Sequence, residues 1–183
     1  CNISSGACST ISGGQNNTAC NTWATISGGF SNSSTGQIST IGGGLYNTAS
    51  GCRSTISGGQ SNNASGFAST ISGGRGNIAS NYFSNIAGGC NNTSSSNYSA
   101  IGGGCGNTAS GSISTIAGGI SNTASGVCST ISGGSGNIAS GNLSFVGGGN
   151  NNCSVSINGT ISGGNNNKVF GNVVTIGGGN QNT

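Results

Sequence analysis

The 183 residues include 40 Gly and 8 Cys but no Pro, Met, His, Asp or Glu, and the formal net charge is +3. General acid–base catalysis relies on His or carboxylates, and calcium or magnesium sites rely on carboxylate oxygens. We therefore expect no enzyme, no catalytic residues, no cofactor and no metal site. The only cations are Arg53, Arg75 and Lys168, and their separation argues against nucleic-acid binding, which needs clustered Lys and Arg.

No apolar run approaches the length of a membrane-spanning helix, which is about 20 residues, so we expect no membrane span. No signal peptide is visible. Because the chain contains no initiating Met, we expect it to be processed or a fragment, and a secretion signal could have been lost with the missing part.

One feature recurs along the whole chain: an Ile or Val stands at every fifteenth position, without insertion or deletion. This column comprises Ile11, Ile26, Ile41, Ile56, Ile71, Ile86, Ile101, Ile116, Ile131, Val146, Ile161 and Ile176. A fixed period of this kind is typical of repeat architectures. The unit reads S-T-I-S-G-G-x-x-N-T-A-S-G-x-x, and it is rich in Gly, Ser and Thr, which disfavour helix.

An Asn follows each member of the Ile column by six residues. The Asn column comprises Asn17, Asn32, Asn47, Asn62, Asn77, Asn92, Asn107, Asn122, Asn137, Asn152, Asn167 and Asn182. Stacked Asn side chains can pass amide hydrogen bonds from rung to rung, as in cross-β ladders. We therefore interpret this column as a structural Asn ladder rather than as a ligand site.

Each unit contains two short alternating segments, S-x-I-x-G (Ser54 to Gly58) and N-x-A-x-G (Asn62 to Gly66). A period of two predicts a strand with one inward and one outward face. Two strands and two turns per unit make one coil, so the fold class predicted is all-β. The chain is expected to be one continuous parallel β-solenoid (β-roll) domain over residues 1–183, with about twelve coils, of which those at 150–183 are less regular. The Ile column fills a thin core.

The stretch NTASGSISTIAGG at 107–119 resembles the head repeats of YadA-like trimeric autotransporter adhesins, and similar runs occur in bacteriophage and viral fibre proteins. The resemblance covers nearly the whole chain. It implies a left-handed parallel β-roll, trimeric in the adhesins, that binds host surfaces or extends a fibre. The chain departs from the family in its strict 15-residue unit and its eight cysteines.

The cysteines offer one candidate disulfide, between Cys90 and Cys105, which lie 15 residues apart in one column. Adjacent rungs are ~4.8 Å apart, and a disulfide can span that Cα separation. The other cysteines are expected either to fill small apolar spaces or to link separate chains. An even number of cysteines fits an oxidising, extracellular compartment.

Thr precedes most members of the Ile column and is expected to form an outward ladder. Its members are Thr10, Thr25, Thr40, Thr55, Thr70, Thr115, Thr130, Thr160 and Thr175. Regular Thr ladders suit ice binding, although Thr also simply favours strands. The column is interrupted at Asn85, Ala100 and Phe145.

The predicted turns carry aromatic side chains that could bind a partner or cover their own backbone. They are Trp23, Phe30, Tyr46, Phe67, Tyr82, Phe83 and Tyr98. Exposed aromatic residues often mark contact surfaces.

These patterns favour a structural fibre or adhesin-like module that is extracellular or on a cell or virion surface. It would self-assemble end to end or laterally into filaments, with trimers as one form. Glycans or a host surface are further partners. Two other functions remain open: an ice-binding solenoid that uses the Thr ladder, and a receptor- or glycan-binding fibre tip that uses the turn aromatics.

Overall fold

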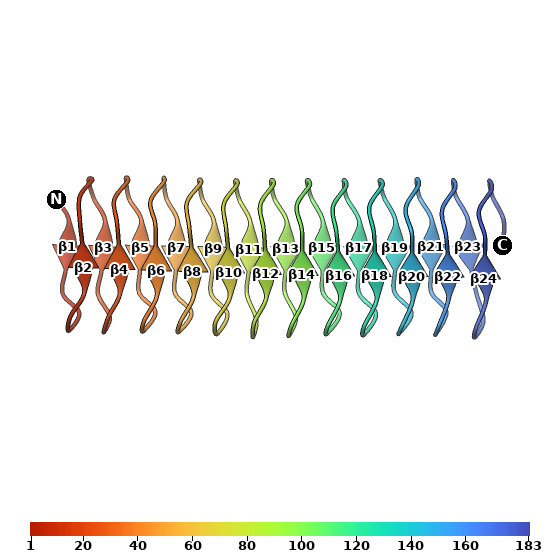
Figure 1. Cartoon of the computed structure of the whole chain (residues 1–183), viewed down its shortest axis with the longest axis horizontal. Helices are drawn as coiled ribbons and strands as arrows, with labels where there is room; N and C mark the ends of the chain where they lie inside the picture. The colour runs from red at the N-terminus through yellow and green to blue at the C-terminus, as the bar shows by residue number, and fades with distance from the viewer. The chain divides into compact units, whose positions relative to one another are not determined.

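The computed structural model describes all residues 1–183 and contains strands but no helix. The chain divides into two compact units, Cys1–Asn91 and Asn92–Thr183. Within each unit the strands follow one another in chain order (Figure 1) and belong to two parallel sheets. The predicted fold class, an all-β parallel solenoid of about twelve coils, is confirmed. The single continuous domain stays a prediction.

Each coil of the first unit contributes two strands of two residues. One sheet contains β1 (Ile3–Ser4), β3 (Thr18–Ala19), β5 (Ser33–Ser34), β7 (Thr48–Ala49), β9 (Asn63–Ala64) and β11 (Ile78–Ala79). The other contains β2 (Thr10–Ile11), β4 (Thr25–Ile26), β6 (Thr40–Ile41), β8 (Thr55–Ile56), β10 (Thr70–Ile71) and β12 (Asn85–Ile86).

The second unit repeats this arrangement. One sheet contains β13 (Thr93–Ser94), β15 (Thr108–Ala109), β17 (Thr123–Ala124), β19 (Ile138–Ala139), β21 (Cys153–Ser154) and β23 (Lys168–Val169). The other contains β14 (Ala100–Ile101), β16 (Thr115–Ile116), β18 (Thr130–Ile131), β20 (Phe145–Val146), β22 (Thr160–Ile161) and β24 (Thr175–Ile176).

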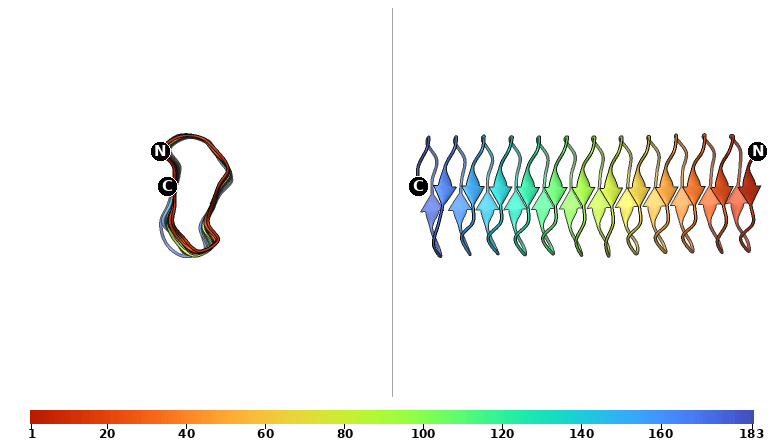
Figure 2. Two further views of the ribbon diagram at one scale, coloured as in Figure 1. Left: turned by 90° about the vertical axis from the view of Figure 1, so that its left-hand side faces the viewer. Right: turned by 180° about the vertical axis from the view of Figure 1, so that it is seen from behind.

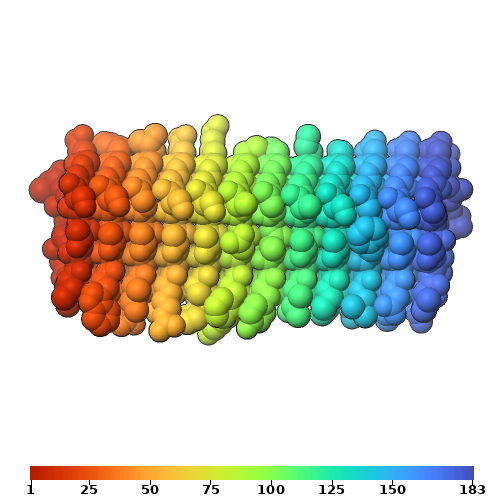
Figure 3. All heavy atoms as spheres, viewed as in Figure 1, coloured from red at the N-terminus to blue at the C-terminus, as the bar shows by residue number.

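The register places equivalent residues of successive coils side by side. Thr55 of β8 pairs with Thr70 of β10, and Ile56 pairs with Ile71. The coils of the first unit accordingly follow nearly the same closed path when viewed end-on (Figure 2, left). Side chains therefore line up in rows along that unit, as its red to yellow-green part shows in Figure 3.

A third row of parallel bridges runs along each unit between the two predicted segments. In the first unit it begins with Gln15, Phe30 and Leu45, which pair in that order. The two alternating segments of the repeat predicted only two strands per coil. The third contact row stays one residue wide in each coil because the next residue, for example Tyr46 after Leu45, has a positive φ of 57° and leaves the extended conformation.

Left-handed residues also bond each coil to the coil before it. Ile38, with φ 60°, donates its N–H to the Thr22 carbonyl of the preceding coil at 2.9 Å. Strand residues donate in the opposite direction, as Thr40 does to the Ser54 carbonyl at 2.9 Å. Within each unit, the interior coils are thus hydrogen-bonded to the coils on both sides, which couples the stability of each coil to that of its neighbours.

The core of each unit is a column of Ile or Val side chains opposite a column of small side chains, mostly Ala and Ser. Ile26 and Ala19 are fully buried, whereas Ile11 and Ile176 are half-buried. The remaining members of the Ile column are buried: Ile41, Ile56, Ile71, Ile86, Ile101, Ile116, Ile131, Val146 and Ile161. Complete removal of an Ile side chain from water contributes about 1.5–3 kcal/mol, so this column is the main apolar contribution of each coil.

Buried glycines set how closely the coils approach. A Cβ on Gly51 would lie 2.0 Å from the carbonyl oxygen of Gly66 in the next coil. By contrast, a Cβ on Gly58 would meet nothing within 4 Å. Of the Gly pair predicted to turn the chain after Ile56, only Gly59 has a φ in the left-handed region, at 92°.

Candidate functional site

The Asn column lies inside the coils, where each side chain connects two coils through the backbone. The Asn47 Nδ2 group donates to the Gly43 carbonyl of its own coil at 3.0 Å and to the Gly59 carbonyl of the next at 2.9 Å. Its Oδ1 accepts the backbone N–H of Asn62 at 3.0 Å. We call this arrangement the Asn spine. It satisfies both side-chain donors of a buried amide, which would otherwise cost several kcal/mol.

The Asn spine repeats in both units. Its buried members are Asn17, Asn32, Asn47, Asn62 and Asn77 in the first unit and Asn92, Asn107, Asn122, Asn137, Asn152 and Asn167 in the second. Asn182 is exposed but still donates to the Gly178 carbonyl at 2.9 Å. Asn2 also belongs to the spine, because its Oδ1 accepts the Asn17 N–H at 3.0 Å. The predicted Asn column did not include Asn2, although this residue lies 15 residues before Asn17.

The spine differs from the expected amide ladder in one respect. Its bonds pass from coil to coil, but most run between a side chain and the backbone. Side chains also bond to one another near the end of the second unit, where the Asn167 Nδ2 donates to Asn152 at 3.0 Å and the Asn182 Nδ2 donates to Asn167 at 2.9 Å. The reason is geometric: the Gly carbonyls already lie within reach of each Nδ2 group, and a buried donor takes the nearest acceptor.

The Thr ladder lies on the outer face of the even-numbered strands. In the first unit Thr10, Thr25, Thr40, Thr55 and Thr70 are in continuous register. In the second unit the ladder is split, because Phe145 pairs with Thr130 on one side and Thr160 on the other. The longest unbroken Thr surface is therefore five residues long and one residue wide.

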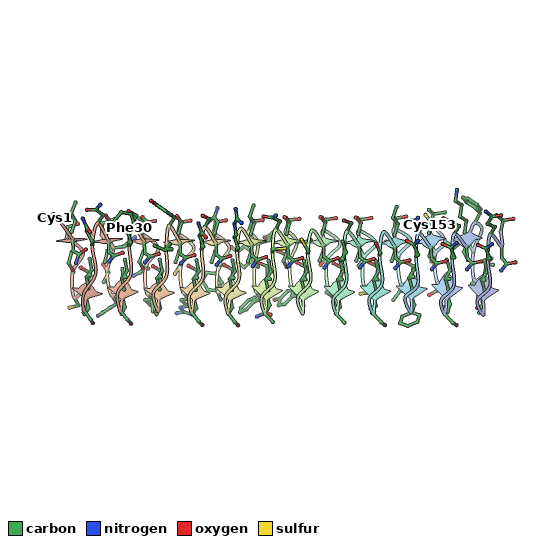
Figure 4. All side chains as sticks on the ribbon, turned by 90° about the horizontal axis from the view of Figure 1, so that it is seen from above. Cys1, Phe30 and Cys153 are labelled. Carbon is green, nitrogen blue, oxygen red and sulfur yellow. The ribbon has the colours of Figure 1, made fainter.

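The turn aromatics of the first unit gather in two groups at different turns. Phe30, labelled in Figure 4, meets Tyr46 edge-on with ring centroids 5.6 Å apart. Phe67 stacks on Tyr82 at 5.5 Å and meets Phe83 edge-on at 5.8 Å. Trp23 belongs to neither group and is 54% exposed, as is Tyr98 of the second unit at 57%.

The cysteines differ in environment. Cys90 and Cys105 are each disulfide-bonded. The predicted bond between them would join the two units and stays a prediction. The remaining six, Cys1, Cys8, Cys20, Cys52, Cys128 and Cys153, are free.

Cys153, labelled in Figure 4, lies on β21 and is half-buried. Burial raises the pKa of the Cys153 thiol, and the ammonium of Lys168 partly offsets this by favouring the thiolate. A raised pKa leaves less thiolate at neutral pH, and the thiolate is the nucleophilic form. This environment suits a structural side chain rather than a reactive one.

Neither unit contains a pocket, and no group of three or more His, Cys, Asp or Glu side chains comes together as a metal site. The structure contains no helix that is long and apolar enough to cross a membrane.

No protein-family model matches the chain, and no curated protein matches it. The class that the structure itself establishes is that of parallel β-solenoid proteins. The resemblance to the head repeats of trimeric autotransporter adhesins stays an expectation from the sequence.

Proposed function

We propose that the chain is a structural, adhesin-like module of an extracellular or surface fibre, which assembles with copies of itself and performs no catalytic step. The observation that carries the proposal is the Asn spine, because within each unit it bonds successive coils through the same three kinds of contact. For Asn47 these contacts are 2.9–3.0 Å long. Such a repeated set of bonds makes stability a sum over neighbouring coils.

The composition supports the same function. A module that presents binding groups at fixed positions needs a regular backbone and outward-facing side chains. Both follow from the 15-residue unit. Acid–base catalysis needs groups that this chain lacks, since it has no His, Asp or Glu. Self-association is favoured by the low charge, since a net charge of +3 over 183 residues provides little mutual repulsion between copies.

Electron microscopy and fibre diffraction of native, unheated protein test this proposal. We expect filaments with a reflection at ~4.8 Å, the spacing between strands. The same preparation with a reducing agent shows whether the filaments are held by packing between chains or by disulfides between chains. We expect the filaments to persist in the reducing agent. Discrete particles about one chain long, with or without reductant, would contradict the fibre.

Ice binding is the second candidate, and the in-register ladder from Thr10 to Thr70 is the observation that favours it. Thermal hysteresis and ice recrystallisation assays test it directly. If the ladder binds ice, replacing the central Thr40 by Lys abolishes the activity, while the same change at Thr48 on the opposite sheet leaves it intact. Absence of hysteresis in the unmodified protein would remove this candidate.

A further inference from the structure

Four side chains from three successive coils meet at one turn of the first unit. The Arg53 guanidinium carbon lies 5.6 Å from the centre of the Phe67 ring. Tyr82 stacks on that ring with an interplanar angle of 30°, and Phe83 meets it edge-on at 75°. With ~4.8 Å between strands, three coils span about 10 Å. We call this group the Arg53 platform.

Backbone hydrogen bonds hold the platform in place before any ligand arrives. The N–H of Phe83 donates to the Phe67 carbonyl of the preceding coil at 2.9 Å. The N–H of Tyr82 donates to the Asn81 side-chain oxygen at 2.9 Å. A ligand that must order flexible side chains loses affinity, because their conformational entropy is lost on binding. The aromatic side chains of the platform rotate about only two torsions each and stand on hydrogen-bonded turns, so this loss is small.

The platform is open to solvent. Tyr82 is 55% exposed and Phe83 46% exposed, and Arg53 is exposed as well. Aromatic surface left in water is a favourable contact area for a ligand with an apolar face.

Charge indicates what else the ligand carries. The chain has no Asp or Glu, so no side-chain carboxylate can pair with Arg53. Arginine binds carboxylates and other oxyanions in a bidentate manner. The anion that complements this guanidinium must therefore come from outside the chain.

We propose that the Arg53 platform binds an acidic saccharide, with a sugar ring on the exposed aromatic rings and its carboxylate or sulfate on Arg53. A single-stranded nucleic acid would also stack on aromatic rings. It is disfavoured because backbone tracking needs several cations, whereas only one is present here. The inference rests on the adhesin-like part of the proposed function, for which it supplies the ligand class.

Binding of defined oligosaccharides to the full-length protein, measured by isothermal titration calorimetry, tests the platform. The probes are 3′-sialyllactose and trigalacturonic acid as carboxylates, a heparin-derived tetrasaccharide as a sulfate, and lactose as the neutral reference. We expect at least one acidic probe to bind about tenfold more tightly than lactose, which corresponds to one charge-assisted contact. Comparison of the carboxylate and sulfate probes assigns the anion.

Matched variants locate the site. Arg53→Gln should abolish the preference for the acidic probe, and Tyr82→Ala should abolish binding. Arg75→Gln makes the same charge change elsewhere, and Tyr46→Ala removes a ring that is 54% exposed and paired with Phe30. Neither control should alter binding, and circular dichroism should show all four variants folded.

Three results would overturn the inference: equal binding of lactose and every acidic probe, equal losses in Arg53→Gln and Arg75→Gln, or tighter binding of an oligothymidine than of any saccharide. Electron microscopy of the same samples keeps the two proposals apart. Filaments without saccharide binding reject the platform alone. Binding by discrete particles supports the platform and rejects the fibre.

Discussion

The side-chain Oδ1 of Asn47 accepts the backbone N–H of Asn62, one coil further along, at 3.0 Å. The Nδ2 of the same Asn47 side chain donates to carbonyls of both coils. One side chain therefore holds two coils in register. A buried polar side chain acts here as a part of the backbone hydrogen-bond network. Substitution of this side chain should therefore destabilise two coils.

Replacing Asn47 by Ala removes three hydrogen bonds and leaves their backbone partners without this side chain. At about 1 kcal/mol for each bond, we expect a loss of about 3 kcal/mol in the free energy of unfolding. Urea denaturation measures the loss, and hydrogen exchange at the Asn62 N–H reports the local opening. Asn85→Ala, at an exposed strand position, is the control and should change stability by less than about 0.5 kcal/mol. Equal losses in the two variants would argue against the spine.

Two glycines of one repeat should respond oppositely to alanine. Gly51→Ala places a Cβ 2.0 Å from the Gly66 carbonyl oxygen, so the coils must separate, and we expect a loss of more than about 3 kcal/mol or failure to fold. Gly58→Ala has free space and an ordinary φ, so it should be neutral or stabilise by up to about 1 kcal/mol. Melting temperatures compare the two, and similar values would refute the packing argument.

Left-handed positions filled by β-branched residues store strain. Ile38 has φ 60°, and the equivalent position in another coil is Asn158, with φ 56°. Asn tolerates this region better than Ile, and the left-handed conformation costs ordinary residues about 1–2 kcal/mol. We expect Ile38→Asn to stabilise the protein by about 1 kcal/mol and Asn158→Ile to destabilise it by a similar amount. Urea midpoints that move in the same direction for both variants would contradict this account.

Alkaline pH should weaken the fold through Cys153. Burial raises the pKa of this thiol above its ordinary value, so the unfolded chain loses the proton first as pH rises. Stability then falls between the ordinary thiol pKa and the raised folded value, and it is unaffected below that range. The measurement is the urea midpoint as a function of pH, which should fall as pH rises above the ordinary thiol pKa. In Cys153→Ser this fall should be smaller than in the unmodified protein. Cys20→Ser, at an exposed site, should reduce the fall less. Alkylation by iodoacetamide should also be slower at Cys153 than at Cys8, as mass spectrometry can measure.

Much of the fold could be predicted from the repeat. The unbroken spacing of the Ile and Asn columns requires a coil of 15 residues, because only a constant coil length keeps the same residue in the core each time. The alternation around Ile56 and Ala64 predicted which side chains lie inside, since period two is the geometry of a strand. The expectation of no acid–base catalysis rests on composition, since the chain has no His, Asp or Glu, and it stays a prediction.

Other features required the tertiary structure, because they depend on distances between coils. The spacing of Asn47 and Gly59 does not show that a side-chain amide bonds a backbone carbonyl of the next coil. The left-handed conformation of Ile38 contradicts its local preference and is imposed by the backward bond to Thr22. The meeting of Arg53 with Phe67 and Tyr82 is likewise set by how three turns stack. The repeat determined which residues are equivalent, whereas coil-to-coil packing decided which of them touch.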